Sequence, residues 1–235
     1  MTDSLHSVNI RIPQKEARPL LGLLLTALLL VGFGLLAAAV HGGGIAEFDR
    51  AVLLMLRTSE TSADPIGPAW LEEVGRDVTS LGSFVFLGFL LAVVAVYLLL
   101  VRRRAEAVLL LVCVLGGTLM STFLKMAFER PRPELPHAAR VFTASFPSGH
   151  ATLSALTFLT VAALLMQATQ DTRLKVFFMS VAVFLTVTVG LSRLYLGVHY
   201  ASDVLAGWCV GSAWAVLCWT VALWLQQREG WRRET

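Results

Sequence analysis

The stretch PLLGLLLTALLLVGFGLLAAAV runs from Pro19 to Val40 and carries no charged side chain. About 20 mostly apolar residues are enough for a helix to cross the hydrocarbon core of a bilayer, so this stretch predicts a transmembrane helix. Five further apolar runs follow it, at Gly82–Val101, Ala107–Met126, Ala151–Thr169, Val176–Leu191 and Ser202–Leu225. We therefore expect an all-α, polytopic membrane protein with six transmembrane helices in one domain, residues 19–225, between tails at residues 1–18 and 226–235.

The composition agrees with lipid as the main solvent of this chain. Hydrophobic residues make up 56% and charged residues only 15%, whereas a soluble domain usually carries about 25% charged residues. The net charge of +3 lies in short clusters between the apolar runs, which favours membrane topology over nucleic-acid binding. A cleaved signal peptide is the alternative for the first run, because Ala37–Ala39 offer a small-residue cleavage site. Its apolar core is longer than the ~7–15 residues typical of such peptides.

Basic residues predict how the helices are oriented. The second and fourth loops are short and basic. Together with the two tails they hold Arg11, Lys15, Arg18, Arg102, Arg103, Arg104, Arg173, Lys175, Arg228, Arg232 and Arg233. The first loop, residues 41–81, is instead long and acidic. Because cytoplasmic segments carry the excess of Lys and Arg, we expect both termini in the cytoplasm and the first loop outside.

The first loop contains an amphipathic pattern after Gly42–Gly44. Apolar residues recur at helical spacing opposite Glu47, Asp49 and Arg50, at Ile45, Phe48, Val52, Met55 and Leu56. This predicts a helix lying on the outer membrane face, or alternatively a loop helix packed on the bundle. Turn signals at Asp64–Pro65 and Gly67–Pro68 follow, and Trp70 is a candidate interface anchor.

The three cysteines, Cys113, Cys209 and Cys218, all lie inside apolar runs. The sequence has no CxxC and no Cys/His cluster, so we expect no metal site and interpret the cysteines as small buried apolar residues.

Two charged stretches interrupt the apolar pattern around the third and fourth runs. Lys125 and Arg132 come where Pro131 and Pro133 stop the third helix; taken alone, they could be a plain basic flank. Residues 147–150, Pro-Ser-Gly-His, precede the fourth run. Ser148 and Gly149 leave backbone N–H groups open at the positive end of a helix dipole, which is an anion site, with His150 beside it. The simpler interpretation is a helix cap with an incidental histidine.

The third stretch begins at Ser192–Arg193 and runs into the sixth helix. His199 and Asp203 are four residues apart, so one helical turn brings them together. An Asp that accepts the imidazole Nδ1–H would leave Nε2 free to attack, although an interfacial salt bridge is the simpler alternative. The stripe continues to Gly207 and Gly211, and small residues at this spacing permit close helix packing, so the face should point into the bundle.

The expected topology brings all three stretches to the outer side, since each lies in or beside an odd-numbered loop. Three cations, two histidines, one aspartate and a helix N-terminus on one face make a phosphate site.

The order K-x6-R-P, then P-S-G-H, then S-R-x5-H-x3-D resembles the three-part signature of the type 2 phosphatidic acid phosphatase superfamily. All eleven specified positions are filled, from Lys125 to Asp203. Arg130 also precedes a proline, but the spacing of the signature selects Arg132. The six apolar runs argue against the soluble haloperoxidases and acid phosphatases of the superfamily and favour its membrane lipid phosphatases.

The resemblance implies roles for these residues. His199 is the expected nucleophile, which forms a phosphohistidine without a metal or other cofactor, and Asp203 orients it. His150 is the expected general acid, and Lys125, Arg132, Arg193, Ser148 and Gly149 are expected to hold the phosphate oxygens.

The expected partners are a lipid phosphate substrate and the bilayer, with no nucleic acid and no obligate protein partner. By analogy, undecaprenyl diphosphate hydrolysis on the periplasmic side of a bacterial-type inner membrane is the first candidate. Phosphatidylglycerophosphate, phosphatidic acid and lipid A phosphates are alternatives. A six-span transporter or flippase with a phosphate-binding pocket is the alternative of another class.

Overall fold

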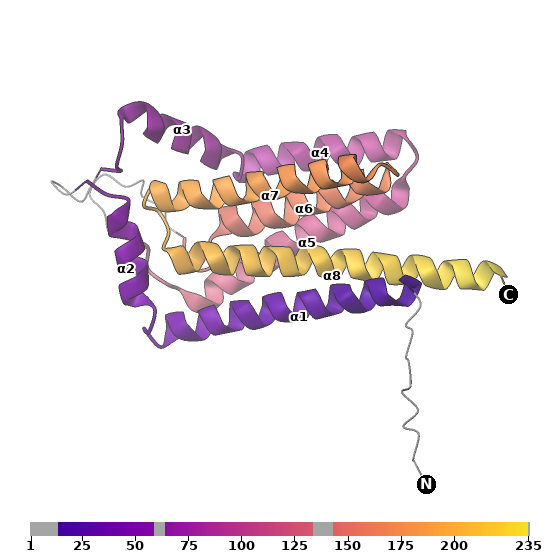
Figure 1. The fold of residues 1–235 in the computed structure, drawn as a ribbon, viewed down its shortest axis with the longest axis horizontal. Helices are drawn as coiled ribbons and strands as arrows, with labels where there is room; N and C mark the ends of the chain where they lie inside the picture. The colour runs from indigo at the N-terminus through magenta and orange to yellow at the C-terminus, as the bar shows by residue number, and fades with distance from the viewer. Residues whose placement is uncertain (1–13, 59–63, 134–142, 235) are drawn as a thin grey trace, which may run out of the picture.

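The chain folds into a bundle of long helices with two short helices at one end (Figure 1). The computed structural model describes residues 14–58, 64–133 and 143–234, and in that part it contains eight helices and no β-strand. Their bounds are α1 (Gln14–His41), α2 (Ala46–Met55), α3 (Ala69–Ser80), α4 (Phe84–Leu100), α5 (Arg104–Phe128), α6 (Gly149–Gln167), α7 (Thr172–Tyr195) and α8 (Ala201–Glu234). The expectations for residues 1–13 lie outside the described residues.

The predicted membrane spans are confirmed. Within the described ranges, five helices are long and apolar enough to cross a membrane, namely α1, α5, α6, α7 and α8, and the bent pair α3–α4 makes a sixth if it counts as one span. That pair bends by 44° between Ser80 and Phe84. The predicted fifth run, Val176–Leu191, is longer in the structure because the side chain of Asp171 caps α7, accepting a hydrogen bond from the Arg173 N–H at 2.8 Å.

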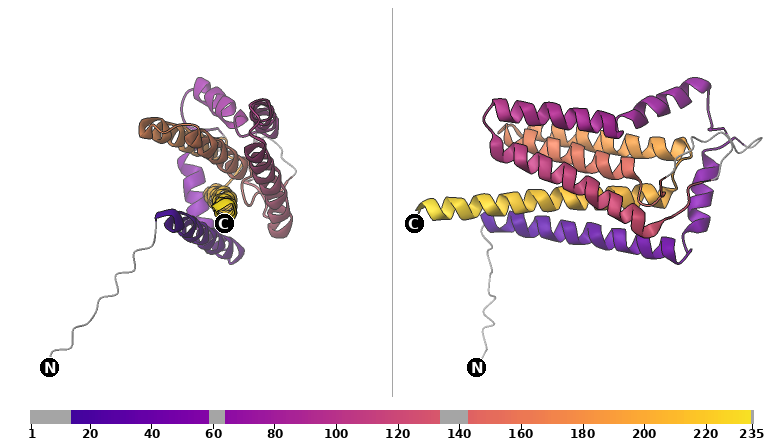
Figure 2. Two further views of the ribbon diagram at one scale, coloured as in Figure 1. Left: turned by 90° about the vertical axis from the view of Figure 1, so that its right-hand side faces the viewer. Right: turned by 180° about the vertical axis from the view of Figure 1, so that it is seen from behind.

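Helix α6 forms the centre of the bundle and contacts α5, α7 and α8, whereas α1 lies along α8 at the edge (Figures 1 and 2). Buried residues make up 61% of the apolar window of α6 but only 11% of that of α1. Leucines of α1 such as Leu21 and Leu35 are exposed. Side chains of this kind suit a helix whose outer face meets lipid.

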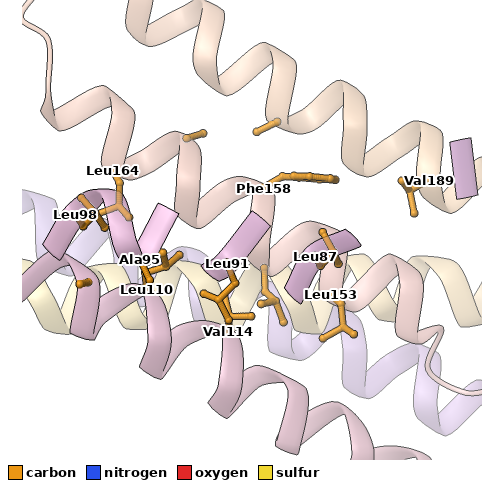
Figure 3. Close-up of a cluster of buried hydrophobic side chains, with 14 residues drawn as sticks. Leu87, Leu91, Ala95, Leu98, Leu110, Val114, Leu153, Phe158, Leu164 and Val189 are labelled. Atoms are coloured by element: carbon orange, nitrogen blue, oxygen red, sulfur yellow. The ribbon is translucent and has the colours of Figure 1, made fainter. Parts of the chain in front are cut away.

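Two kinds of packing hold α6 in place. Leucines and other apolar residues of α4, α5 and α6, including Leu91, Leu110 and Leu153, form one buried core (Figure 3). On the other side, α8 approaches through its glycines. A Cβ added at Gly207 would lie 2.8 Å from the carbonyl oxygen of Ser148, and one added at Gly211 would collide with the carbonyl of Thr152. The predicted small-residue face is therefore confirmed.

Helix α2 confirms the amphipathic helix of the first loop but corrects its orientation. Asp49, which we assigned to the polar face, is fully buried against the bundle, while Phe48 and Met55 are exposed. Helix α3 was not predicted. Its apolar residues are sparse, and Pro68 before it makes no side-chain cap. Both helices lie at the end where α1 finishes and α8 begins (Figure 1).

Residues of the short basic loops, Arg102–Arg104, Arg173 and Lys175, lie at the opposite end, where α1 begins and α8 finishes (Figure 1). The alternation expected from the sequence therefore holds in space. All three signature stretches lie at the end with α2 and α3.

Candidate active site

A cavity of about 630 Å³ opens at this end of the bundle, and its wall includes residues of all three stretches. They are Lys125, Arg132, Gly149, His150, Arg193 and His199. The junction of α3 and α4 adds Glu72, Arg76, Thr79 and Phe84 to the wall. The sequence pattern had not pointed to this second group, because α3 carries no recognisable motif.

Lys125 reaches the cavity from the last turn of α5. The helix stops at Glu129, which adopts a left-handed conformation with φ 42°, ahead of the two prolines. The ammonium group of Lys125 donates a hydrogen bond to the carbonyl of Ala144 at 2.8 Å. A Cβ at position 149 would lie 3.3 Å from Lys125 Cε, so glycine there leaves room for the lysine beside the N-terminus of α6.

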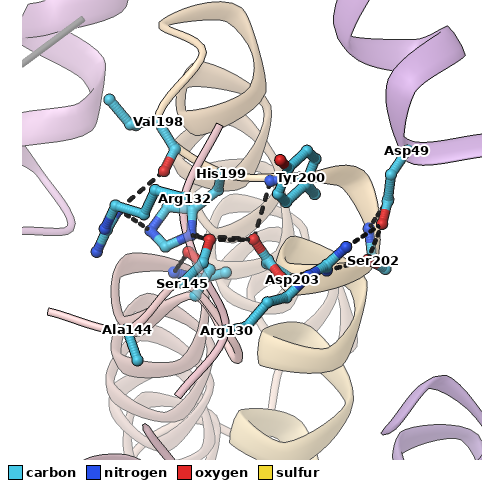
Figure 4. Close-up of polar contacts among 12 residues, drawn as sticks. Asp49, Arg130, Arg132, Ala144, Ser145, Val198, His199, Tyr200, Ser202 and Asp203 are labelled. Atoms are coloured by element: carbon cyan, nitrogen blue, oxygen red, sulfur yellow. Dashed lines mark hydrogen bonds and ion pairs between the residues drawn. The ribbon is translucent and has the colours of Figure 1, made fainter. Parts of the chain in front are cut away.

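Arg132 is held beside the proposed nucleophile by several acceptors. Its guanidinium donates to the carbonyls of Thr143 at 2.9 Å and Val198 at 2.8 Å, and to the Thr143 hydroxyl at 3.1 Å. The same Nη1 lies 3.0 Å from His199 Nε2 (Figure 4). Because a guanidinium only donates, Nε2 of His199 is the acceptor and carries no proton in this arrangement.

The other ring nitrogen of His199 faces Asp203, as the spacing predicted. Nδ1 lies 3.4 Å from Asp203 Oδ2 and 3.3 Å from the Ser145 hydroxyl. Asp203 Oδ2 also accepts hydrogen bonds from Ser145 Oγ at 2.5 Å and from the Tyr200 N–H at 2.9 Å. With the proton on Nδ1, Nε2 carries the lone pair, which accepts the hydrogen bond from Arg132 Nη1 in this structure.

Burial sets the charge of this histidine. His199 is 1% exposed and Asp203 0% exposed. Burial lowers the pKa of His199 from 6.5 to about 3, and the nearby cations Arg132 and Arg193 act in the same direction against Asp203. The ring is therefore neutral at physiological pH, as a nucleophile must be.

His150 and Arg193 complete the cavity wall. Arg193 donates from Nη1 to the Thr79 hydroxyl at 2.9 Å, and its buried Nε has no hydrogen-bond partner within the described part of the chain. A Cβ at Gly82, in the bend between α3 and α4, would lie 3.3 Å from His150 Cδ2. The bend therefore packs directly on the ring of His150.

Two of the predicted residues lie behind the cavity wall. Ser148 is fully buried and caps α6, where its hydroxyl accepts from the Ala151 N–H at 3.5 Å, while its own N–H donates to the Asp203 carbonyl at 2.9 Å. Its predicted role on phosphate oxygens stays a prediction. Asp203 contacts Nδ1 of His199 through its Oδ2 atom, as an orienting residue would.

Sequence reasoning missed four polar residues around the pair: Asp49, Arg130, Ser145 and Ser202. Arg130 was noticed and set aside in favour of Arg132, yet its Nη1 lies 2.7 Å from Asp203 Oδ1. Burial lowers the pKa of Arg130, but the two carboxylates Asp203 and Asp49 raise it, and the pKa is raised overall. Its own proline, Pro131, was the available signal. Ser145 lies just before the second stretch. Asp49 lies four residues after Ile45 and three before Val52, so its spacing places it among the apolar residues of the helix, and this was the available signal.

The candidate site fits a phosphate group better than a metal ion. In the ranges that the structure describes, no group of three or more His, Cys, Asp or Glu side chains could hold a metal. Three cations of the signature stretches, Lys125, Arg132 and Arg193, line the cavity instead, together with Arg76 of α3.

Fold and cavity together describe an enzyme of the membrane that acts on phosphate, and comparison with known proteins agrees. The PAP2 superfamily profile matches residues 106–227. Phosphatidylglycerophosphatase B of Bacillus subtilis is 31% identical over 180 residues, which cover 76% of this chain and 85% of the relative. A lipid A 1-phosphatase of Rhizobium etli is 30% identical over 181 residues, covering 65% of this chain and 74% of the relative.

Two solved structures share the fold of this chain. A transmembrane PAP2-type phosphatidylglycerolphosphate phosphatase from Bacillus subtilis superposes with a TM-score of 0.73 at 29% identity, over 82% of this chain and 93% of that one. LpxE of Aquifex aeolicus shares the fold, with a TM-score of 0.54 at 22% identity over 74% and 93% of the two chains.

The chain belongs to the PAP2 superfamily, and it is a membrane lipid phosphatase, a hydrolase of phosphoric esters. The alternative of a transporter or flippase is therefore set aside.

Proposed function

We propose that the protein hydrolyses the phosphate ester of a membrane phospholipid through a covalent phosphohistidine at His199. The observation that carries the proposal is the position of the His199 ring. His199 lines the cavity, with Nε2 at 3.0 Å from Arg132 Nη1 and Nδ1 at 3.4 Å from the buried carboxylate of Asp203. This is the arrangement that a neutral histidine needs to act as a nucleophile.

In the first step, Nε2 of His199 attacks phosphorus while the bond from phosphorus to the lipid oxygen breaks. His150, in its protonated form, gives its proton to the departing oxygen, so the lipid leaves as an alcohol. In the second step, His150 accepts a proton from water, and the water oxygen attacks phosphorus. The P–N bond breaks, inorganic phosphate leaves, and His150 is again protonated.

The cations have the task of holding the phosphoryl oxygens through both steps. Lys125, Arg132 and Arg193 line the cavity. The Nε of Arg193, which has no hydrogen-bond partner among the described residues, offers a donor to a phosphate oxygen. The Gly149 N–H at the start of α6 adds another. Fixed cations stabilise the charge that spreads over the transferring group.

Phosphatidylglycerophosphate is the substrate we propose first, since the relative with 85% of its length matched is named for that reaction. The lipid A 1-phosphatases support the same class of lipid phosphate. Hydrolysis of undecaprenyl diphosphate, the substrate expected from the sequence, stays a prediction.

A substrate panel tests the proposal. Purified protein in detergent should release inorganic phosphate from phosphatidylglycerophosphate, with lipid A 1-phosphate, phosphatidic acid and undecaprenyl diphosphate measured beside it. His199→Ala should release none and should trap no acid-labile, alkali-stable phosphate. Wild-type protein that releases phosphate from none of these lipids, or a His199→Ala variant that retains turnover, would contradict the proposal.

We also propose that the cavity opens to the periplasmic side, with both termini in the cytoplasm. The support is the basic charge of Arg102–Arg104, Arg173 and Lys175 at the end opposite the cavity. In a background without the three natural cysteines, Trp70→Cys on exposed α3 should react with a membrane-impermeant thiol reagent in intact cells. Arg104→Cys should not, and the reverse labelling would invert the topology.

A further inference from the structure

Arg130 joins two buried carboxylates that come from distant parts of the chain. Nη1 lies 2.7 Å from Asp203 Oδ1, and Nη2 lies 2.7 Å from Asp49 Oδ2 on α2 (Figure 4). The side chain of Arg130 is 15% exposed, and those of Asp49 and Asp203 are 1% and 0% exposed. The two ends of one guanidinium therefore fix two acids that are separated by more than 150 positions.

Asp49 also binds the first turn of α8, directly beside Asp203. The Ser202 N–H donates to Asp49 Oδ1 at 2.9 Å, and the Ser202 hydroxyl donates to Asp49 Oδ2 at 2.5 Å. Arg130 in turn donates to the Ser202 hydroxyl at 2.8 Å and stacks 4.4 Å from the ring centre of Tyr200. Every polar atom of the Asp49 carboxylate is thus engaged by α8 or by Arg130.

The consequence for the site follows from the two oxygens of Asp203. Oδ1 is held by Arg130, while Oδ2 receives Ser145, the Tyr200 N–H and the Nδ1 side of His199. A carboxylate fixed at one oxygen cannot rotate freely about its last bond, so Oδ2 stays directed at the histidine. Without Asp49, the guanidinium loses one of its two carboxylate partners, which are the strongest of the groups that set its position.

We propose that Asp49 and Arg130 are positioning residues for the nucleophile, acting in the series Asp49, Arg130, Asp203, His199. The proposal rests on the proposed role of His199. It assigns to α2, which contributes no residue to the cavity wall, a part in the chemical step. The competing interpretation is that the same ion pairs merely fasten α2 to the end of the bundle.

A double-mutant cycle with Asp49→Asn and Arg130→Gln separates the two interpretations. A positioning role predicts that Asp49→Asn lowers kcat about tenfold and Arg130→Gln about 100-fold, with KM changed less than twofold. We take these magnitudes by analogy from residues that orient the histidine ligands of metal sites, which contribute about 10- to 100-fold. The double variant should be no slower than Arg130→Gln alone, because Asp49 acts through Arg130. Arg130→Lys should recover part of the loss, since an ammonium can still bind Asp203.

Folding is followed in the same samples by thermal unfolding in detergent. Arg130→Gln leaves two carboxylates facing each other without a cation between them. If this variant does not fold, Asp49→Asn and the double variant, which has one buried carboxylate fewer, carry the test. Arg103→Gln is the matched control, because it removes a guanidinium paired with Glu106 at 2.9 Å at the other end of the bundle. It should keep wild-type kcat and KM.

The outcome of the cycle is decisive in either direction. A folded Asp49→Asn protein with wild-type kcat, even with a lowered Tm, would show that the network only fastens α2, and losses that add in the double variant would refute the series. If wild-type protein turns over but traps no phosphohistidine, the proposed role of His199 fails first, and the positioning role fails with it. If wild-type protein traps phosphate and Asp49→Asn traps it at the same single-turnover rate, only the positioning role fails.

Discussion

Replacing Asp203 by asparagine tests the core of the site, because the amide must fail in either of its two orientations. If the NH2 group takes the place of Oδ2, it points at His199 Nδ1, which must then accept. The ring proton moves to Nε2, where it meets the donor Arg132 Nη1 at 3.0 Å, and the lone pair needed for attack is lost. If the NH2 group takes the place of Oδ1, it faces Arg130 Nη1 at 2.7 Å, donor against donor.

The size of the effect follows from the role of the carboxylate. The corresponding carboxylate-to-amide change beside a catalytic histidine in serine proteases costs about 10⁴-fold in kcat through the wrong tautomer. The same loss here corresponds to about 5 kcal/mol at 1.36 kcal/mol per tenfold. The second orientation would preserve the tautomer but take from the buried guanidinium of Arg130 one of its two carboxylate partners, with Asp49 left in place. Removing one partner of a buried ion pair typically costs about 3–5 kcal/mol of stability.

The assay measures initial rates of phosphate release together with Tm for the variant. Asp171→Asn is the matched control, since Asp171 caps α7 at the far end of the bundle and asparagine caps a helix nearly as well; we expect its kcat to match that of the wild type. An Asp203→Asn protein with the wild-type Tm and a kcat within tenfold of wild type would refute the orienting role.

Four further predictions address acid catalysis, pH, packing and metal dependence. His150→Ala should slow the hydrolysis of lipid substrates by about 100-fold or more. With a nitrophenyl phosphate, whose leaving group needs no proton, the variant should still form phosphohistidine and then stall. Absence of the trapped intermediate would contradict this. Burial lowers the pKa of His199 from 6.5 to about 3, so between these values the unfolded chain binds a proton that the native state excludes. The free energy of unfolding should therefore fall by on the order of 1 kcal/mol per pH unit as pH drops below 6.5. If Tm falls with pH as steeply in His199→Gln as in the wild type, the pH dependence comes from another group. Gly211→Ala, which collides with the Thr152 carbonyl, should lower Tm and activity, with a cost of about 1–3 kcal/mol, whereas Gly34→Ala, with nothing within 4 Å of its new Cβ, should not lower Tm. Turnover should persist in EDTA, and complete loss restored by magnesium would overturn the mechanism.

The spans and the signature residues could be predicted from sequence because the signals are local. Apolar length alone identifies a helix that can cross a bilayer, and alternation of the spans then brings Lys125, His150 and His199 to one end without knowledge of any contact. The four-residue spacing of His199 and Asp203 gave their pairing for the same reason.

The partners of Arg130 could not be predicted in this way. Its contact with Asp49 joins residues 81 positions apart, and the sequence analysis grouped Asp49 with Glu47 and Arg50 on the polar face of the helix. A polar face is where a carboxylate is expected, because a lone carboxylate is costly to bury. That reasoning fails when a guanidinium and the N–H and hydroxyl of Ser202 receive both oxygens, since they replace the lost water. Helix α3 was missed although Leu71, Val74 and Val78 recur at helical spacing, a signal that the sequence reasoning did not use; in the structure this helix contacts α7.

The balance of charge at this end of the bundle explains why the site suits an anion. Asp203 and Asp49 both pair with Arg130, and at the cavity wall Arg76 pairs with Glu72 at 2.6 Å. In the part of the chain that the structure describes, no carboxylate lies within 4.0 Å of the charged groups of Lys125, Arg132 or Arg193. Three partly desolvated cations that share one cavity repel each other, and a phosphate dianion relieves that repulsion more completely than any neutral headgroup can. Substrate binding and catalysis therefore use the same three cations, and the buried pair Asp203–Arg130 can orient His199 without neutralising these cations.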